Sequence, residues 1–190
     1  LLSLITIFLA ESEASIVAII GTLIVAGLWK KHTRLATFGI VVIGSLLTLI
    51  SPWKDFVIEK LTLQDYSGGV RLSQWSETFN LLKDHWLFGA GLSGFQAVLE
   101  PYHLATHLEI FQYPHNIFLN FWVEIGLLGL VAVTILGYKA WQHRAHPATL
   151  IPLLALTHMF IHGLVDVPYF KNDLALLTWI LLAIVFAYAG

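Results

Sequence analysis

The sequence predicts an all-α polytopic membrane protein, in which a bundle of transmembrane helices carries one large extracytoplasmic loop. Three observations predict this class. Of the 190 residues, 57% are hydrophobic and 12% are charged, whereas a soluble domain carries about 25% charged residues. The apolar residues gather in runs close to the roughly 20 residues that a membrane-spanning helix needs. One stretch, residues 52–114, separates these runs and holds seven of the twelve acidic residues.

The first predicted region, residues 1–51, consists of transmembrane helices. Leu1–Ala10 is too short to span a membrane, so we interpret it as the end of a truncated helix and the chain as the C-terminal part of a longer protein. Ala14–Trp29 and Leu35–Ile50 are the next two predicted spans. A basic turn at residues 30–34 is expected to join them.

The second region, residues 52–114, is far too long for a connection within a helix bundle. We therefore predict an extracytoplasmic loop with helices of its own. Residues 71–83 follow the run Ser-Gly-Gly and show the pattern of an amphipathic helix that begins at Arg71. Such a helix is expected to lie across the bundle. Its predicted apolar face consists of Leu72, Trp75, Phe79 and Leu82.

The third region, residues 115–190, contains three predicted transmembrane helices, which are Asn116–Tyr138, Ala148–Val165 and Leu174–Gly190. The turns at 30–34 and 139–146 hold five of the ten Lys and Arg residues and no acidic residue. By the positive-inside rule these turns are cytoplasmic. The large loop and the turn at residues 166–173 then share the extracytoplasmic face.

A polar stripe is expected on the first of these three helices, because Asn116, Asn120 and Glu124 fall at i, i+4 and i+8. A carboxylate on a membrane helix costs several kcal/mol unless it faces the bundle interior or a wet cavity. The stripe fits either hydrogen bonds between helices or a functional site. A transporter is the alternative of a different class, with the stripe along the path of the solute. Against it, no helix in the sequence shows the mid-depth interruption that marks many transporter sites.

Arg71 is the only arginine on the predicted outer side, and it lies near the start of a helix. A guanidinium at such a place suits a phosphate or diphosphate, although a solvated loop arginine has the same pattern. The run from Gly89 to Gly94 matches G-x-G-x-x-G. No preceding strand or βαβ unit accompanies it, which excludes a dinucleotide site. We expect a tight turn there, and its amides could line an anion pocket.

Two histidine patterns raise the question of a metal. His103 and His107 are spaced i and i+4, which brings them together only if that segment is helical, and His158, His162 and Asp166 rise in steps of four. We favour hydrogen bonds at helix interfaces for both sets and predict no metal and no cofactor. The chain has no cysteine, and it lacks the motifs of zinc proteases and serine hydrolases.

Four segments taken together resemble the signature of the O-antigen ligase/polymerase family. They are R-L-S-Q-W from Arg71, W-L-F-G-A-G from Trp86, P-H-N around His115 running to E-I-G at Glu124, and H-G-L-V-D-V-P from His162. The resemblance covers residues 67–190 and extends to the two preceding helices. It implies a GT-C-like helix bundle in the bacterial inner (cytoplasmic) membrane, with the active site on the extracytoplasmic face.

The same resemblance implies a metal-independent, inverting glycosyltransferase. Its donor would be a glycan linked to undecaprenyl diphosphate, and its acceptor a hydroxyl of a lipid, a protein or a glycan, with no role for nucleic acid. Ligase and polymerase are not separable on this pattern. His115 matches the essential histidine of the family and Arg71 matches an arginine that binds the donor diphosphate. Glu13 stands where members often carry a second arginine.

The chemistry of the residues agrees with these roles. A fixed cation stabilises the negative charge that develops on a diphosphate leaving group, and a neutral histidine suits the deprotonation of a hydroxyl. We expect His115 at an extended junction after Pro114. Nine residues of helix rise about 13 Å, so we assign Glu124 to bundle architecture rather than to a pair with His115. Asn116, Glu124 and Asp166 are possible supporting residues of the site.

Overall fold

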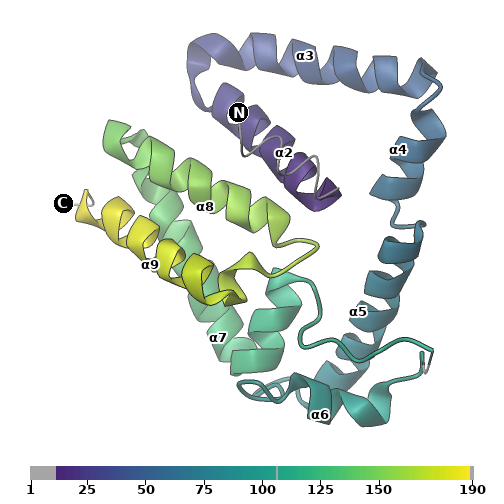
Figure 1. The fold of residues 1–190 in the computed structure, drawn as a ribbon. Helices are drawn as coiled ribbons and strands as arrows, with labels where there is room; N and C mark the ends of the chain where they lie inside the picture. The colour runs from purple at the N-terminus through teal and green to yellow at the C-terminus, as the bar shows by residue number, and fades with distance from the viewer. Residues whose placement is uncertain (1–11, 106, 189–190) are drawn as a thin grey trace. The chain divides into compact units, whose positions relative to one another are not determined.

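A computed structural model of the chain describes residues 12–105 and 107–188, and all regular secondary structure in these ranges is helical (Figure 1). The chain divides into two compact units, residues 1–72 and 73–190. The predicted helix end at Leu1–Ala10, together with Glu11, lies outside the described residues. The helical class expected from the composition is confirmed.

The first unit begins with α2 (Glu13–Trp29) and α3 (Lys31–Ile50), which match two predicted spans. Only Lys30 separates them, so the basic turn predicted at residues 30–34 is wrong, and its residues from 31 onward form the first turn of α3. The side chains of Thr33 and Arg34 explain the short connection. They donate to the carbonyls of Gly27 and Leu28, at 2.6 and 3.1 Å, and so occupy acceptors that the end of a helix leaves open.

Among the described residues, two helical stretches are long and apolar enough by length and composition to cross a membrane, and they cover residues 31–50 and 117–145. The second of them is divided at Gly126. α3 buries none of its residues, and Leu35 and Ile50 are each 81% exposed. An apolar surface of this kind needs lipid or further helices around it. Shorter apolar helices cover Glu13–Trp29, Pro147–His162 and Asn172–Ala187.

Two further helices, α4 (Lys54–Leu61) and α5 (Tyr66–Asp84), follow within the predicted loop. α5 begins five residues before the predicted start at Arg71. The reason is an N-cap, since Asp65 Oδ1 accepts a hydrogen bond from the amide of Gly68 at 3.2 Å. Arg71 therefore lies in the second turn of α5, and its expected place at a helix start is wrong.

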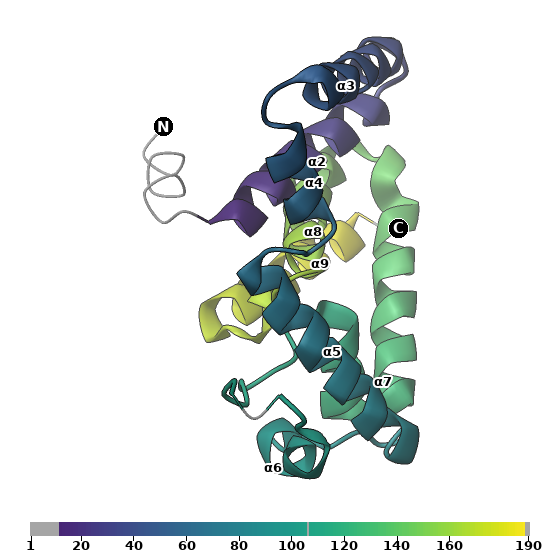
Figure 2. The same ribbon diagram turned by 90° about the vertical axis from the view of Figure 1, so that its right-hand side faces the viewer.

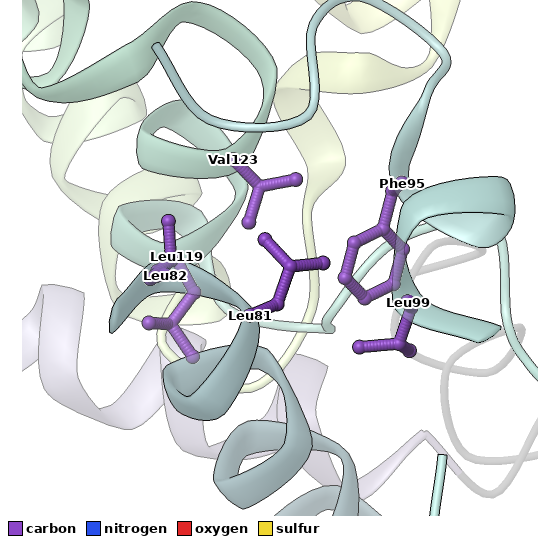
Figure 3. Close-up of a cluster of buried hydrophobic side chains, with 6 residues drawn as sticks. All are labelled: Leu81, Leu82, Phe95, Leu99, Leu119 and Val123. Carbon is purple, nitrogen blue, oxygen red and sulfur yellow. The ribbon is translucent and has the colours of Figure 1, made fainter. Parts of the chain in front are cut away.

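The buried face of α5 differs from the predicted apolar face. Leu72 and Phe79 are 45% and 50% exposed, so half of the predicted face is not buried. The core instead joins three helices, which are α5, α6 (Phe95–Leu99) and α7 (Ile117–Gln142) (Figure 3). Its buried side chains are Leu81, Leu82, Phe95, Leu99, Leu119 and Val123.

The second unit continues after α7 through short 3-10 turns to α8 (Leu150–His162) and α9 (Asn172–Ala187). These helices occupy the remaining predicted spans. The predicted turn between α8 and α9 is present, and it contains a 3-10 helix at Pro168–Phe170.

α7 is not a straight helix, because Gly126 has φ 71° and ψ 179° and divides it into residues 117–125 and 127–142. A straight helix of 26 residues would be about 39 Å long. Its two ends, however, meet the two ends of α8. The amide of Ile117 donates to the carbonyl of Gly163 at 2.6 Å, and Thr149 Oγ1 donates to the carbonyl of His143 at 2.8 Å.

The segment between Thr149 and Gly163 is only about 21 Å long. α7 must therefore bend sharply at Gly126, as Figures 1 and 2 show. The two parts of α7, residues 117–125 and 127–142, are about 14 and 24 Å long. They form a triangle with the segment from Thr149 to Gly163, so residues 117–125 run across α8 and residues 127–142 run beside it. The expectation that no helix is interrupted is wrong.

Residues 86–93, which we call the docking loop, fill the break in α7. The amides of Ala90 and Gly91 donate to the carbonyl of Val123 at 2.7 and 3.2 Å, and the amide of Leu127 donates to the carbonyl of Leu87 at 3.1 Å. These bonds pair two of the backbone groups at the break, the carbonyl of Val123 and the amide of Leu127, which would be costly to leave unpaired in an apolar environment. A Cβ at Gly126 would collide with the carbonyl of Leu87.

Candidate active site

His115 occupies a tight backbone junction directly before α7. Its φ is 46°, so the residue is left-handed and the expected extended junction is wrong. A non-glycine residue in this region costs about 1–3 kcal/mol and needs support from its surroundings. Trp75 Nε1 supplies part of it by donating to the carbonyl of Pro114 at 2.8 Å. Pro114 itself is fully buried.

Asn116 supplies the support on the other side of His115. Its Oδ1 accepts hydrogen bonds from the amides of Phe118 and Leu119, both at 3.1 Å, which makes Asn116 the N-cap of α7. Its Nδ2 donates to the carbonyl of Leu164 at 3.0 Å. Asn116 thereby holds the start of α7 against the turn that follows α8.

Asp166 is the partner of the His115 imidazole. His115 Nδ1 lies 3.3 Å from Asp166 Oδ1, which also accepts the amide of Val167 at 2.8 Å. Both side chains keep some exposure, 26% for His115 and 21% for Asp166. A carboxylate at Nδ1 favours the tautomer with its proton on Nδ1 and leaves Nε2 as a lone-pair base. The arrangement therefore suits proton abstraction by His115.

The pKa of Asp166 is lowered to about 2. Burial by itself raises the pKa, but the hydrogen bond from His115, the amide of Val167 and the charge of Lys171 outweigh it. Asp166 is therefore ionised at neutral pH and can stabilise a protonated imidazole.

The second oxygen of Asp166 faces two further nitrogens. His162 Nε2 lies at 3.6 Å and Lys171 Nζ at 3.8 Å, both beyond hydrogen-bond distance. Of the two histidines in the stepped pattern, His162 lies next to Asp166. The ring of His158 meets the ring of His162 instead, with centroids 6.3 Å apart. Within residues 12–105 and 107–188, no three His, Cys, Asp or Glu side chains form a metal-binding group. The structure adds His115 and Lys171 to this cluster, a combination that helical spacing cannot show.

Two aromatic rings enclose the imidazole of His115. Phe111 and Tyr113 meet it edge to face, with ring centroids 5.3 and 4.9 Å away. Edge-to-face contacts of this kind restrict the plane of a ring. Together with Asp166 they hold the orientation of His115.

Glu77 is a structural residue that the sequence pattern missed. It is only 5% exposed, and its Oε1 accepts the amides of Leu104 and Ala105, both at 2.9 Å. Its Oε2 lies 3.0 Å from His103 Nδ1. Burial alone would raise the pKa of Glu77, but the amide of Ala105, the His103 side chain and the amide of Leu104 lower it. The interaction fixes the beginning of the segment that ends at His115.

The spacing of the polar residues on α5 was the signal for this role. Gln74, Glu77, Thr78, Leu81 and Leu82 fall at i, i+3, i+4, i+7 and i+8, which places them on one helix face. Three of the five, Gln74, Glu77 and Thr78, are polar, and this hides the face from a search for apolar stripes. The i, i+4 metal interpretation of His103 with His107 fails, because residues 103–107 contain no helix among the described positions.

The predicted polar stripe on α7 does not act as one unit. Asn116 is a cap, and Asn120 is fully buried with neither side-chain amide atom paired within the described residues. Glu124 Oε2 accepts the amide of Ser93 at 2.9 Å, so the glycine-rich docking loop binds a carboxylate of its own chain. Glu124 accordingly fastens the loop to α7.

Arg71 and Glu13 belong to the first unit, whereas His115 and Asp166 belong to the second. The assignment of Arg71 to a donor diphosphate therefore stays a prediction. Glu13 Oε1 pairs with Lys60 Nζ at 2.8 Å, and the same ammonium pairs with Asp65 at 2.9 Å. The cation next to Glu13 is therefore Lys60, and its ammonium is held by two carboxylates.

Comparison with known proteins gives one finding. A family model described as O-antigen ligase matches residues 1–134 of the 190. No curated protein and no solved structure gives a significant match. The matched range includes His115, Asn116 and Glu124, and it ends before Asp166.

Proposed function

The chain belongs to the O-antigen ligase family, and we propose that it transfers a glycan from an undecaprenyl-diphosphate-linked donor to an acceptor hydroxyl. The family places the chain in polysaccharide assembly as a glycosyltransferase-like enzyme. The observation that carries the proposed chemistry is the 3.3 Å contact between His115 Nδ1 and Asp166 Oδ1, because it prepares Nε2 to accept a proton.

In the proposed reaction, His115 Nε2 takes the proton of the acceptor hydroxyl as the oxygen attacks the anomeric carbon of the donor. The bond from that carbon to the diphosphate oxygen breaks, and undecaprenyl diphosphate leaves with the electron pair. A single displacement of this kind inverts the anomeric centre. Asp166 stabilises the imidazolium that forms. General-base catalysis is worth about 100- to 10,000-fold in rate.

We assign the donor diphosphate to Arg71, because a guanidinium is always charged and forms paired hydrogen bonds with phosphate oxygens. The proposed reaction is metal-independent, since protein cations stabilise the leaving group. We place the protein in the bacterial inner membrane as a multi-pass protein, with His115 on the extracytoplasmic face. Two candidate spans and the basic residues at the α2–α3 connection support this location.

Proteoliposomes that contain the protein and a labelled glycan on undecaprenyl diphosphate test the proposal. We expect transfer by the wild type and a loss of at least about 100-fold for His115→Ala, with the protein still folded and still binding donor. His107→Ala is the matched control, because His107 is an exposed histidine of the same loop. Full activity of His115→Ala would contradict the catalytic assignment. Loss of wild-type activity on chelation would contradict metal independence.

A transporter is the second candidate, and the break in α7 is the observation that favours it, since interrupted helices mark many transport sites. The freed groups at this break, however, bind the docking loop, which leaves the carbonyl of Val123 and the amide of Leu127 occupied. A transporter would move the glycan across the proteoliposome membrane without transferring it. The same preparation distinguishes the two functions.

A further inference from the structure

We propose that Lys171 binds the diphosphate of the donor and stabilises it as the leaving group. The inference rests on the glycosyl transfer proposed above. It adds a cation from the same unit as the base, whereas Arg71 belongs to the other unit.

The geometry of Asp166 motivates this role. Its Oδ1 is committed to His115 and to the amide of Val167, at 3.3 and 2.8 Å. Its Oδ2 faces Lys171 Nζ at 3.8 Å, which is an ion pair but not a hydrogen bond. An ammonium has three donors, and within the described residues Lys171 pairs with no carboxylate other than Asp166. Its donors are therefore available to an incoming anion.

The negative charge of Asp166 is a second reason to expect a cation at this place. Asp166 carries a negative charge beside the proposed base, so it repels a diphosphate that approaches His115. The interaction between two unit charges near a protein surface, whether repulsive or attractive, is several kcal/mol at about 4 Å. Lys171 cancels the charge of Asp166 and, with 54% of its side chain exposed, can reach beyond the carboxylate.

No other cation of the second unit fits this place. Residues 73–190 contain four Lys and Arg side chains, which are Lys83, Lys139, Arg144 and Lys171. Lys139 and Arg144 lie at the end of α7 where His143 meets Thr149, which is the opposite end of α8 from Gly163. Lys83 Nζ is bonded to Asn80 on α5 at 2.7 Å. Lys171 is the one in contact with Asp166.

The proposed step is balanced without a further reactant. When the bond from the anomeric carbon to oxygen breaks, the electron pair stays on the diphosphate oxygen, and the ammonium of Lys171 donates a hydrogen bond to that diphosphate. The proton of the acceptor hydroxyl goes to His115 Nε2. Lys171 keeps its own protons and acts by charge and hydrogen bonding alone.

The test is binding of undecaprenyl diphosphate, the released product, to the protein in nanodiscs, with undecaprenyl phosphate as the second ligand. We expect Lys171→Met to weaken diphosphate binding about tenfold, as the loss of one charge-assisted hydrogen bond predicts, and Lys171→Arg to restore most of it. Lys83→Met is the matched control and should bind like the wild type.

In the transfer assay, Lys171→Met should raise the KM for the donor and leave the KM for the acceptor unchanged. Diphosphate affinity of Lys171→Met equal to that of the wild type would overturn the inference. Unchanged affinity together with a lower kcat would also overturn it, because Lys171 would then act only on Asp166. A wild type that binds diphosphate but transfers no glycan would instead contradict the proposed function and leave the binding role of Lys171 intact.

Discussion

The two ends of residues 117–125 in α7 depart from helical geometry in different ways. His115, just before the segment, has φ 46°, and Gly126, just after it, has φ 71°. At His115 the surroundings are side chains, which cap the helix and pair with the imidazole. At Gly126 they are backbone groups of the docking loop. At the first end a titratable side chain, His115, stays partly exposed. At the second end the hydrogen bonds to the docking loop join backbone groups that do not titrate, which is why we place the chemistry at the first end.

Gly126→Ala tests the Gly126 end of this comparison, and we expect it to have the largest effect on stability. The new Cβ would meet the carbonyl of Leu87 and lie 2.9 Å from Phe88 Cα, at a positive φ that alanine disfavours. We expect the free energy of unfolding to fall by more than about 2 kcal/mol, measured by thermal unfolding in detergent.

Gly137→Ala is the control for that change. Gly137 lies in the second segment of α7, and a Cβ added there would meet no neighbouring group within 4 Å. Alanine favours helix at this position, so the stability of the variant should be equal or higher by up to about 1 kcal/mol. Equal stability of the two variants would show that the docking loop does not hold the break.

Asp166→Asn tests the end of the segment at His115 and should lower kcat for glycan transfer. An asparagine can present its amide to His115 Nδ1 and so favour the wrong tautomer. The same change in serine proteases costs about 10⁴-fold; the 3.3 Å contact here is long, so we expect roughly a hundredfold loss of kcat. Steady-state transfer kinetics measure it. A variant with normal kcat would remove Asp166 from the proton-transfer site.

The pH dependence of stability provides a second test of Asp166→Asn. The folded pKa of Asp166 is about 2, below its ordinary value of 3.8. The carboxylate therefore contributes stability above about pH 4, and this contribution is lost as the pH falls toward 2. Unfolding measured between pH 5 and 2 should depend less on pH in the variant than in the wild type.

The smallest effect is expected from Glu124→Gln. Glutamine keeps an oxygen for the amide of Ser93 and loses only the charge on a bond of 2.9 Å. We expect a loss of about 1 kcal/mol in stability and normal transfer by the folded protein. Glu100→Gln, at an exposed position of the 3-10 helix Glu100–Tyr102, should change neither. A drop in kcat without a drop in stability would place Glu124 in the active site. The Gly126 end would then also contribute to the reaction, which would contradict the comparison above.

Local patterns in the sequence were enough to predict most helices. The apolar runs of α2, α3, α8 and α9 stand out because each helix is apolar over nearly its whole length. The start of α5 differs from the prediction because Ser67, Gly68 and Gly69 have weak helix propensity, and the cap by Asp65 overrides it. The buried side of α5 was mistaken for a similar reason, since the burial of Glu77 is offset by partners from residues 103–105.

The sequence by itself determined the helical class and the family, through hydropathy and through short motifs whose residues are neighbours. The role of His115 stays a prediction from the same motifs. Only the tertiary structure decided the bend at Gly126, the place of the docking loop and the cluster of His115, Asp166 and Lys171. These features join segments that lie far apart along the chain. Periodicity reports which residues share a helix face, but it carries no information on which distant segment supplies the partner of a freed backbone group or a charged side chain.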